Sequence, residues 1–525
     1  MLLLPILHTA VIMERRSIRA RARLWTGGVI TCGGVVLLAT LGLPLAWRFA
    51  MLLAGLMRYP YPADGLEGTL LTQAHLLWSG QQLYQPFELY RFVSAPYPPW
   101  HSLILGFADQ FVGPHAFWSG RMVSLIAGVL VLVVVASSVR IIVGSLLAGI
   151  VAAIYLFCTP PFILWATRIK PDMSALLWTA LGLLLASFAL GWAGDQPPHA
   201  PARRHLLATG CAALCFSLAF FTKQTALTGP LAAGLAFLVS EVQVWRATPR
   251  RRFALPQTLL FGLSYLALIG VSWLVLDLWS HGQFTFHIWT QHRAAKWSSA
   301  LMWKYVALLT DYWPLMLLGT GLLALALRDR RARVMAWYML LVPLTLIGAG
   351  KTGANHNHLL ETLLALALAA GLALGWALRT RRPTMLLVAI TLVALQLGLE
   401  ARPPAWYRTE LVRTDSPERY LAFLRATPGE VLADDPSLLY LVGKPLRYDD
   451  PSGFGPVAAT GLWNQRGLID DIAQQRFSAI MIPTNVAHAS SDATERWTPA
   501  MLAAIDQHYR VLFNDTLVIY VPKEE

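Results

Sequence analysis

The sequence predicts a mainly α-helical, polytopic membrane protein with about eleven transmembrane helices, juxtamembrane helices in the first outer loop and a small C-terminal α/β soluble domain. Two observations support this fold class. Of the 525 residues, 56% are hydrophobic and only 14% are charged, whereas about 25% of the residues in a soluble domain are charged. The apolar residues also gather in runs close to the roughly 20 residues that a helix needs to cross a bilayer. We therefore expect a multi-pass protein of the inner (plasma) membrane.

Eleven apolar runs have the length and composition of membrane spans. They lie near residues 25–46, 121–139, 142–160, 173–193, 206–222, 224–240, 257–279, 308–327, 334–350, 358–378 and 384–400. A further run at 99–113 is shorter and carries His101 and Asp109. If this run crossed the membrane, every later arginine cluster would change sides, so we expect it to lie at the membrane surface as a juxtamembrane helix.

Arginine clusters between the apolar runs set the expected orientation. The clusters are "RR" at 203–204, "RATPRRR" at 246–252, "RDRRAR" at 328–333 and "RTRR" at 379–382. The positive-inside rule places short basic loops of this kind in the cytoplasm, together with the N-terminal tail at 1–24. The formal net charge of +13 is then explained by topology, and we expect no nucleic-acid partner. The transmembrane domain at 25–400 has its first outer loop at about 48–118.

Beyond residue 400 the pattern changes to that of a soluble domain at 401–525. "EVLADD", "FSAIMIP" and "YRVLFNDTLVIYVP" have the composition of strands, with "NDT" as a hairpin turn. Helical spacing occurs at 415–426, 466–476 and 498–508. Because an odd number of spans precedes it, we expect this α/β domain on the extracytoplasmic side.

Asp64 and Glu67 form an acid pair in the first outer loop, within "YPYPADGLEGTLLTQAHLLWSG" at 59–80. Their spacing matches a capping box, in which side chains at the start of a helix satisfy its unpaired N–H groups. The same acids are expected close to the outer membrane surface, where a carboxylate could act on a lipid-linked substrate. Local sequence leaves both interpretations open.

A second group of charges precedes the span that begins near 173. "WATRIKPDMSALLW" places Arg168, Lys170 and Asp172 on the outer side, against the usual bias of basic residues toward the cytoplasm. Snorkelling side chains with a helix cap are one interpretation, and a phosphate-binding site is the other. Lys223 in "FFTKQTAL" and Lys351 in "GKTGANHNHLLE" also lie between apolar spans, where a charge is costly unless it reaches water, an acid or a phosphate.

Histidines gather in two of the expected outer loops. His292 and Arg293 lie in "HGQFTFHIWTQHRAAKW". The segment "NHNHLLE" contains five polar side chains, of which Asn355, His356, His358 and Glu361 are the candidates for the site. Because this spacing matches no standard metal site, capping and hydrogen bonding are favoured over zinc binding. We assign no metal ligands, and a divalent metal stays open as a cofactor.

Taken in order, these segments resemble the C-class (GT-C) membrane glycosyltransferases, which include protein O-mannosyltransferases and the lipid A aminoarabinose transferase. The resemblance rests on "DGLEGTLLTQAHLLWSGQQLY", "YPPW" at 97–100, Arg121 at the start of a span, "RIKPD", "TKQTAL" and "NHNHLLE". It covers residues 25–400 and is one of pattern and topology.

The resemblance implies a transferase that moves a sugar from a polyprenyl-phosphate donor to an acceptor hydroxyl at the outer face of the membrane. An acid of the first outer loop is the catalytic base in this family, which points to Asp64 or Glu67. Many members have adjacent acids there, whereas two residues separate them here. Asp172 lies where members often carry another acid. Displacement on one face would invert the anomeric centre.

Other site residues follow from the same resemblance. Basic side chains are expected to stabilise the phosphate as it leaves with increased charge; they are Arg168, Lys170, Lys223 and Lys351. Eight residues are expected to line the substrates: His101, Arg121, His292, Arg293, Asn355, His356, His358 and Glu361. Membrane lipid and an acceptor on a protein, lipid or glycan are the expected partners.

Two other functional classes fit the composition. A transporter or flippase for a lipid-linked or anionic substrate would use the same charges along a path through the bilayer. Against it, the acids gather in outer loops rather than in the middle of spans. A membrane scaffold would use the outer domain only to bind a partner.

Overall fold

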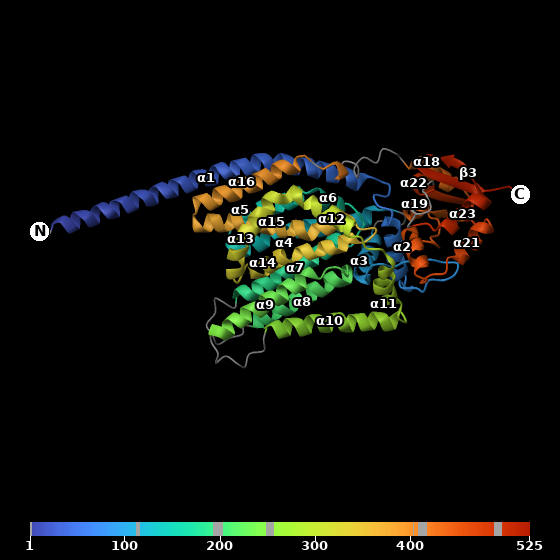
Figure 1. The fold of residues 1–525 in the computed structure, drawn as a ribbon, viewed down its shortest axis with the longest axis horizontal. Coiled ribbons are helices and arrows are strands. Elements are labelled where there is room, and N and C mark those ends of the chain that lie inside the picture. The colour runs from blue at the N-terminus through green and yellow to red at the C-terminus, as the bar shows by residue number, and fades with distance from the viewer. Residues whose placement is uncertain are drawn as a thin grey trace.

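The computed structural model describes residues 3–111, 116–192, 203–247, 257–402, 404–407, 417–487 and 496–524. A bundle of long helices forms most of the molecule, and a small α/β domain lies at one end of it (Figure 1). The N-terminus extends beyond the opposite end of the bundle (Figure 1). The mainly α-helical membrane fold predicted from the sequence is therefore confirmed.

Helices of very different length build the bundle. The long ones are α1 (Leu3–Arg58), α4 (Trp118–Val143), α7 (Asp172–Trp192), α8 (Arg203–Thr222), α9 (Thr228–Ala247), α10 (Gln257–Trp279), α13 (Trp313–Arg328), α15 (Leu360–Thr380) and α16 (Pro383–Glu400). The shorter ones are α5 (Leu146–Phe157), α6 (Pro160–Ala166), α11 (Gln283–Thr285), α12 (Ser299–Ala307) and α14 (Arg333–Leu341). Short π and 3-10 segments join them: η1 (Phe286–Thr290), η2 (Gln291–Ala294), η3 (Leu308–Tyr312), η4 (Val342–Gly350) and η5 (His356–Leu359).

Over the described ranges, nine segments are long and apolar enough to cross a membrane, and the bent pair of α5 and α6 brings the total to ten at most. The run expected as one span at 142–160 is this pair, whose axes meet at 75°. Pro160 and Pro161 open α6, and proline cannot donate the backbone hydrogen bond that would continue α5. The span expected at 224–240 is the 20-residue α9, which is not among the nine. The predicted count of eleven is therefore not confirmed.

Helix α1 is longer than the span expected at 25–46. It continues to Arg58, so the loop expected to start at about 48 begins at Tyr59. Leucine, methionine, alanine and arginine dominate the added turns, and these are strong helix formers. We call residues 59–117 the first loop.

Helix α15 lies at the centre of the bundle. Within its apolar window, 94% of the residues are buried inside the protein, and it packs against α4, α5, α13 and α16. Gly371 and Gly375 make this packing close, because Val139 and Val143 occupy the space where their Cβ atoms would lie. Small residues bring membrane helices together in this way.

Two helices of the first loop, α2 (Glu67–Trp78) and α3 (Pro99–Asp109), lie at the end of the bundle that faces the α/β domain (Figure 1). They pack against each other, and α3 also packs against α4 and α8. Helix α3 is the short helix expected at 99–113, and it is not one of the candidate spans.

The C-terminal domain, residues 417–524, contains a four-stranded sheet in the order β1–β2–β4–β3. Its strands are β1 (Val431–Ala433), β2 (Ala479–Pro483), β3 (Tyr509–Asn514) and β4 (Leu517–Pro522). Strand β1 is parallel to β2, and the other pairs are antiparallel. The helices are α18 (Glu418–Ala426), α19 (Pro436–Leu441), α20 (Pro451–Ala459), α21 (Arg466–Ala473), α22 (Thr484–Ala487) and α23 (Pro499–His508). The strands, the hairpin and the three helices predicted for this domain are confirmed.

Replacing Gly375 by valine is expected to destabilise the bundle, whereas Gly398→Val in α16 should not. A side chain at Gly375 meets both Cβ and a methyl of Val143, and Gly398 has no atom within 4 Å of the added Cβ. Overpacking of this kind costs about 1–3 kcal/mol. Thermal unfolding of the two variants in the same detergent measures the difference. Equal midpoints would contradict the close packing of α15 against α4.

Candidate functional site

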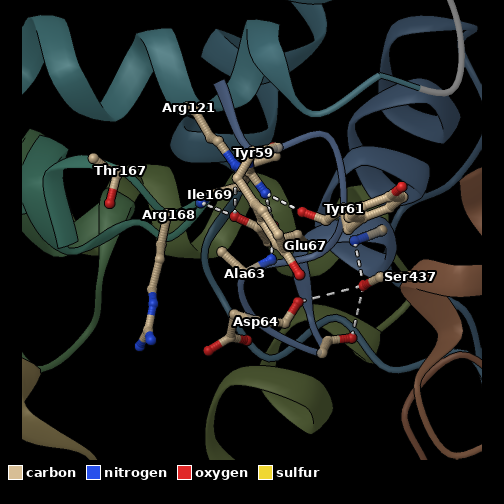
Figure 2. Close-up of polar contacts among 12 residues, drawn as sticks. Tyr59, Tyr61, Ala63, Asp64, Glu67, Arg121, Thr167, Arg168, Ile169 and Ser437 are labelled. Atoms are coloured by element: carbon tan, nitrogen blue, oxygen red, sulfur yellow. Dashed lines mark hydrogen bonds and ion pairs between the residues drawn. The ribbon is translucent and has the colours of Figure 1, made fainter. Parts of the chain in front are cut away.

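The candidate site lies where the first loop, the turn between α6 and α7, and the C-terminal domain meet (Figure 2). Asp64 and Glu67 come from the first loop, Arg168 from the turn, and Ser437 from the C-terminal domain (Figure 2). Tertiary contacts thus bring together acidic and basic site residues that were predicted in segments far apart in the chain.

Glu67 begins α2, and 0% of its surface is exposed. Its Oε2 accepts hydrogen bonds from the Arg121 guanidinium and from the Ala63 N–H, both at 2.8 Å. Its Oε1 accepts from the Ile169 N–H at 3.0 Å and from Arg121 Nε at 3.3 Å (Figure 2). A carboxylate has about four acceptor positions, and all of them are used here. Glu67 therefore joins the loop to its neighbours and has no free lone pair for a substrate.

Arg121, in the first turn of α4, is 1% exposed. Besides Glu67, its guanidinium contacts the carbonyl oxygens of Tyr59 and Tyr61, the second at 2.6 Å. The predicted substrate-lining role of Arg121 stays a prediction, because its polar groups face protein while the residue also borders a cavity between the ends of α1 and α4. The Glu67–Arg121 pair fastens the start of the first loop to the end of a membrane helix.

The capping box suggested by Asp64 and Glu67 is present only in part. Asp64 Oδ1 accepts the Leu66 N–H at 3.0 Å, and Glu67 accepts the Ala63 N–H. Neither acid caps the N-terminus of α2, because the residue at the capping position is Leu66 and it makes no side-chain hydrogen bond.

Asp64 is the accessible acid of the three predicted for the site. Its side chain is 21% exposed, compared with 0% for Glu67 and 4% for Asp172. Its Oδ1 pairs with Lys170 Nζ at 2.8 Å, and the Arg168 side chain extends toward the same side of the loop (Figure 2).

Electrostatics keep the Asp64 carboxylate ionised. Burial alone raises the pKa of Asp64, but the Lys170 ammonium and the Arg168 guanidinium outweigh burial and hold this pKa well below its usual range. In return, burial lowers the pKa of Lys170, but Asp64, Tyr97 and Asp172 together outweigh burial and raise this pKa. At neutral pH the site therefore contains a carboxylate between two cations.

Asp172, the first residue of α7, forms a second ion pair. Its Oδ1 accepts hydrogen bonds from Lys223 Nζ at 2.5 Å and from Asn357 Nδ2 at 2.8 Å. Lys223 follows α8, and Asn357 lies in η5, so three segments converge on one carboxylate. Asn357 was not among the predicted residues, although its segment was. The sequence could not indicate which of the polar side chains in "NHNH" faces Asp172.

The residues just before α3 connect the charged pairs. The Pro96 carbonyl accepts hydrogen bonds from Gln224 Nε2 at 3.0 Å and from His292 Nε2 at 2.7 Å. Tyr97 lies within electrostatic reach of four charged groups, those of Asp64, Lys170, Asp172 and Lys223. Tyr97 and Gln224 were also not predicted as site residues. Both lie in segments that carried the family resemblance, "YPPW" and "TKQTAL", which was the only signal for them.

His292 and Lys351 form a third pair of site residues. The Nε2–H group of His292 donates to Pro96, so Nδ1 accepts from Lys351 Nζ, 3.0 Å away. Burial and the nearby Lys351 ammonium lower the pKa of His292 to about 4. Burial lowers the pKa of Lys351 to about 8. The histidine is neutral at pH 7, and the lysine is close to its titration range.

His101 lies beside the charged pairs, in α3. It is 1% exposed, and neither ring nitrogen has a hydrogen-bond partner among the described residues. Burial lowers the pKa of His101 to about 4, so the ring is neutral. The charges of Asp172 and Lys170 both reach it.

The other predicted residues are distributed around the site. His358 and Glu361 lie within electrostatic reach of Lys223, so they border the second ion pair. The His356 ring stacks on Trp406, with centroids 3.6 Å apart. Asn355 Oδ1 accepts the His356 N–H at 2.7 Å, and Arg293 is exposed on η2. Local contacts therefore account for His356 and Asn355.

A cavity of about 670 Å³ lies between the ends of α1 and α4. It is mainly apolar, and its lining includes Leu53, Met57, Trp118 and Leu125. Arg58 and Arg121 also line it, but Asp64 does not. Within the described parts of the chain, no group of three or more His, Cys, Asp or Glu side chains is arranged to hold a metal ion.

The membrane bundle, the first-loop helices and the C-terminal domain together have the fold of GT-C-type glycosyltransferases. The chain is similar to ArnT from Cupriavidus metallidurans bound to undecaprenyl phosphate, with a TM-score of 0.56, 13% identity, and 93% of this chain and 98% of that chain covered. Its similarity to the apo state of ArnT has a TM-score of 0.57, 14% identity and the same coverage of 93% and 98%. No protein-family model and no curated protein sequence matches the chain. At this identity the likeness describes the fold.

Replacing Glu67 by glutamine is expected to destabilise the protein strongly. The amide leaves the buried Arg121 without a counter-charge, and breaking a buried ion pair costs about 3–5 kcal/mol. Thermal unfolding in detergent should therefore give a much lower midpoint for Glu67→Gln than for Asp64→Asn, which alters a partly exposed side chain. A Glu67→Gln protein as stable as wild type would contradict the anchoring role of the pair.

Proposed function

We propose that this protein transfers a sugar from a polyprenyl-phosphate donor to an acceptor hydroxyl at the outer face of the plasma membrane. The observation that carries the proposal is the accessible Asp64 carboxylate, held between Lys170 and Arg168, in a protein with a GT-C fold. ArnT, a similar structure, was crystallised with undecaprenyl phosphate. This supports a lipid phosphate as the leaving group for the present chain.

Asp64 is the proposed general base. The oxygen of the acceptor hydroxyl attacks the anomeric carbon of the sugar and forms the new glycosidic bond. The hydroxyl proton passes to Asp64, while the bond between the anomeric carbon and the phosphate oxygen breaks. Attack opposite the leaving group inverts the anomeric centre. Glu67 is the weaker candidate, because its oxygen atoms are occupied by Arg121, Ala63 and Ile169.

Cationic side chains are proposed to hold the departing phosphate. Arg168, Lys170, Lys223 and Lys351 are four cations in this region, where Lys170 pairs with Asp64 and Lys223 pairs with Asp172. A cluster of cations suits a phosphate that gains charge as it leaves, because charge-assisted hydrogen bonds are strongest where the charge develops.

The pairing of Asp64 with Lys170 makes the base sensitive to the donor. A carboxylate whose pKa is held low is a weak base, and Lys170 and Arg168 are the groups that hold it low. A donor phosphate that binds these cations competes with Asp64 for them. The carboxylate then becomes more basic when the donor is in place.

The proposed orientation is supported by the basic turns at one end of the bundle. Arg331 packs against Gly191 near the end of α7, and Arg379 pairs with Asp329 at 3.8 Å. These basic turns therefore meet at the end of α7 opposite Asp172. With the positive-inside rule, this supports a cytoplasmic N-terminal tail and an extracytoplasmic first loop and C-terminal domain. The apolar cavity between α1 and α4 is a proposed resting place for part of a lipid chain.

Asp64→Asn is expected to reduce sugar transfer by about 10²–10⁴-fold, the usual contribution of a general base. The assay measures transfer of radiolabelled sugar from a panel of undecaprenyl-phosphate sugars in membranes that carry equal amounts of each protein. Asp506→Asn, which alters an exposed acid on α23, is the matched control and should transfer at the wild-type rate. If the Asp64→Asn protein transfers sugar at the wild-type rate, Asp64 is not the general base.

Affinity for the donor is expected to fall as pH rises through about 8, where Lys351 loses its proton. The protonated lysine attracts the phosphate below this pH and the neutral amine does not. Lys351→Arg stays charged, because arginine titrates only above about pH 12, so its donor KM should stay low at pH 9. The measurement is the pH dependence of KM for the donor from pH 6 to 9.5. Identical profiles for the two proteins would exclude Lys351 from phosphate binding.

A further inference from the structure

The C-terminal domain reaches the backbone turn that carries Asp64. Ser437, in α19, is completely buried. Its Oγ accepts the Gly68 N–H at 2.9 Å, and its hydroxyl lies 3.0 Å from the Gly65 carbonyl and 3.4 Å from the Asp64 carbonyl (Figure 2). One hydroxyl group of the C-terminal domain therefore contacts the backbone at Asp64 and Gly65 and also at Gly68, in the first turn of α2.

This contact replaces a helix cap that α2 lacks. The first N–H groups of a helix have no partner inside the helix, and a side-chain oxygen at the preceding residue usually accepts from the second or third of them. The preceding residue of α2 is Leu66, which has no such oxygen. Gly68 is the second residue of the helix, and Ser437 supplies its acceptor from 369 positions further along the chain.

The two segments fit too closely for this contact to shift freely. A Cβ atom at Gly68 would lie only 2.6 Å from Ser437 Cα, so glycine is required for α19 to approach. A second bond holds the same interface, since Thr69 Oγ1 donates to the Asp449 carbonyl at 2.7 Å. The Asp449 carboxylate in turn accepts the Ser94 N–H at 2.8 Å.

We propose that Ser437 is a positioning residue for Asp64, and that the C-terminal domain therefore completes the active site. The inference rests on the proposed function, because that function makes Asp64 the base. Ser437 does not reach the reacting atoms. It fixes the peptide groups next to Asp64, so that the carboxylate stays between Lys170 and Arg168. Without the hydroxyl, the turn loses its partner at Gly68 and the carboxylate moves over a wider range.

The test compares Ser437→Ala with two other variants of the full-length protein. Thr69→Val removes a hydrogen bond of the same interface that does not touch the Asp64 turn. Ser437→Thr keeps the hydroxyl and should restore much of what the alanine variant loses. Hydrogen exchange of the peptide that covers residues 64–70 is measured in detergent, together with kcat and donor KM for transfer from undecaprenyl-phosphate sugars. All values refer to the folded fraction recovered from size-exclusion chromatography.

Ser437→Ala is expected to speed exchange at Gly68 about fivefold, the effect of losing one hydrogen bond of typical net strength. It should also lower kcat about tenfold or more, because misplacement of a catalytic group by a fraction of an ångström slows the reaction. Donor KM should change much less. Unchanged exchange in Ser437→Ala, or an equal loss of kcat in Thr69→Val, would overturn the inference.

The failure of this inference is distinguishable from failure of the proposed function. If Asp64→Asn is inactive and Ser437→Ala keeps the wild-type kcat, only the positioning role is wrong. If Asp64→Asn keeps the wild-type rate, the mechanism itself is wrong, and faster exchange in Ser437→Ala then reports a structural cap alone, which also overturns the positioning role.

Discussion

The buried Glu67–Arg121 ion pair is the interaction on which the arrangement of the site depends. It ties the start of α2 to the first turn of α4, and through the Ile169 N–H it also holds the turn that carries the cations near Asp64. A buried pair of this kind stabilises a fold only when its remaining lone pairs and protons also have partners, and the carbonyl oxygens of Tyr59 and Tyr61 accept hydrogen bonds from the Arg121 guanidinium. The loop thus gains a fixed geometry at the edge of the membrane bundle, where a backbone without regular structure would otherwise be mobile.

The two acids of the first loop have separate tasks because their surroundings differ. Glu67 is enclosed and fully bonded, and it holds the structure together. Asp64, three residues earlier in the chain, is partly exposed and has a cationic neighbour in Lys170, so it can exchange partners when an anionic substrate binds. The fixed Glu67 side chain holds the loop in position, and this keeps Asp64 close to the geometry that catalysis requires.

Hydrophobic periodicity was sufficient to predict the membrane bundle, the strands and helices of the C-terminal domain and the short helix α3, because burial dictates those patterns locally. It predicted a span at 224–240, whereas α9, which contains Glu241 and Arg246, is not one of the candidate spans, and it placed the end of α1 too early. It could not separate Asp64 from Glu67, since both fit a helix start and only Arg121, supplied by another helix, distinguishes them. Asn357 and Ser437 were not predicted as site residues for the same reason, because each contacts a residue far away in the sequence.

The most direct test of the central claim is made with purified wild-type protein in liposomes that contain a series of radiolabelled undecaprenyl-phosphate sugars and candidate acceptors. We expect the label to move to an acceptor and free undecaprenyl phosphate to appear in equal amount. If the labelled lipid instead crosses the bilayer intact, with no undecaprenyl phosphate released from any donor, the protein is a flippase and not a glycosyltransferase.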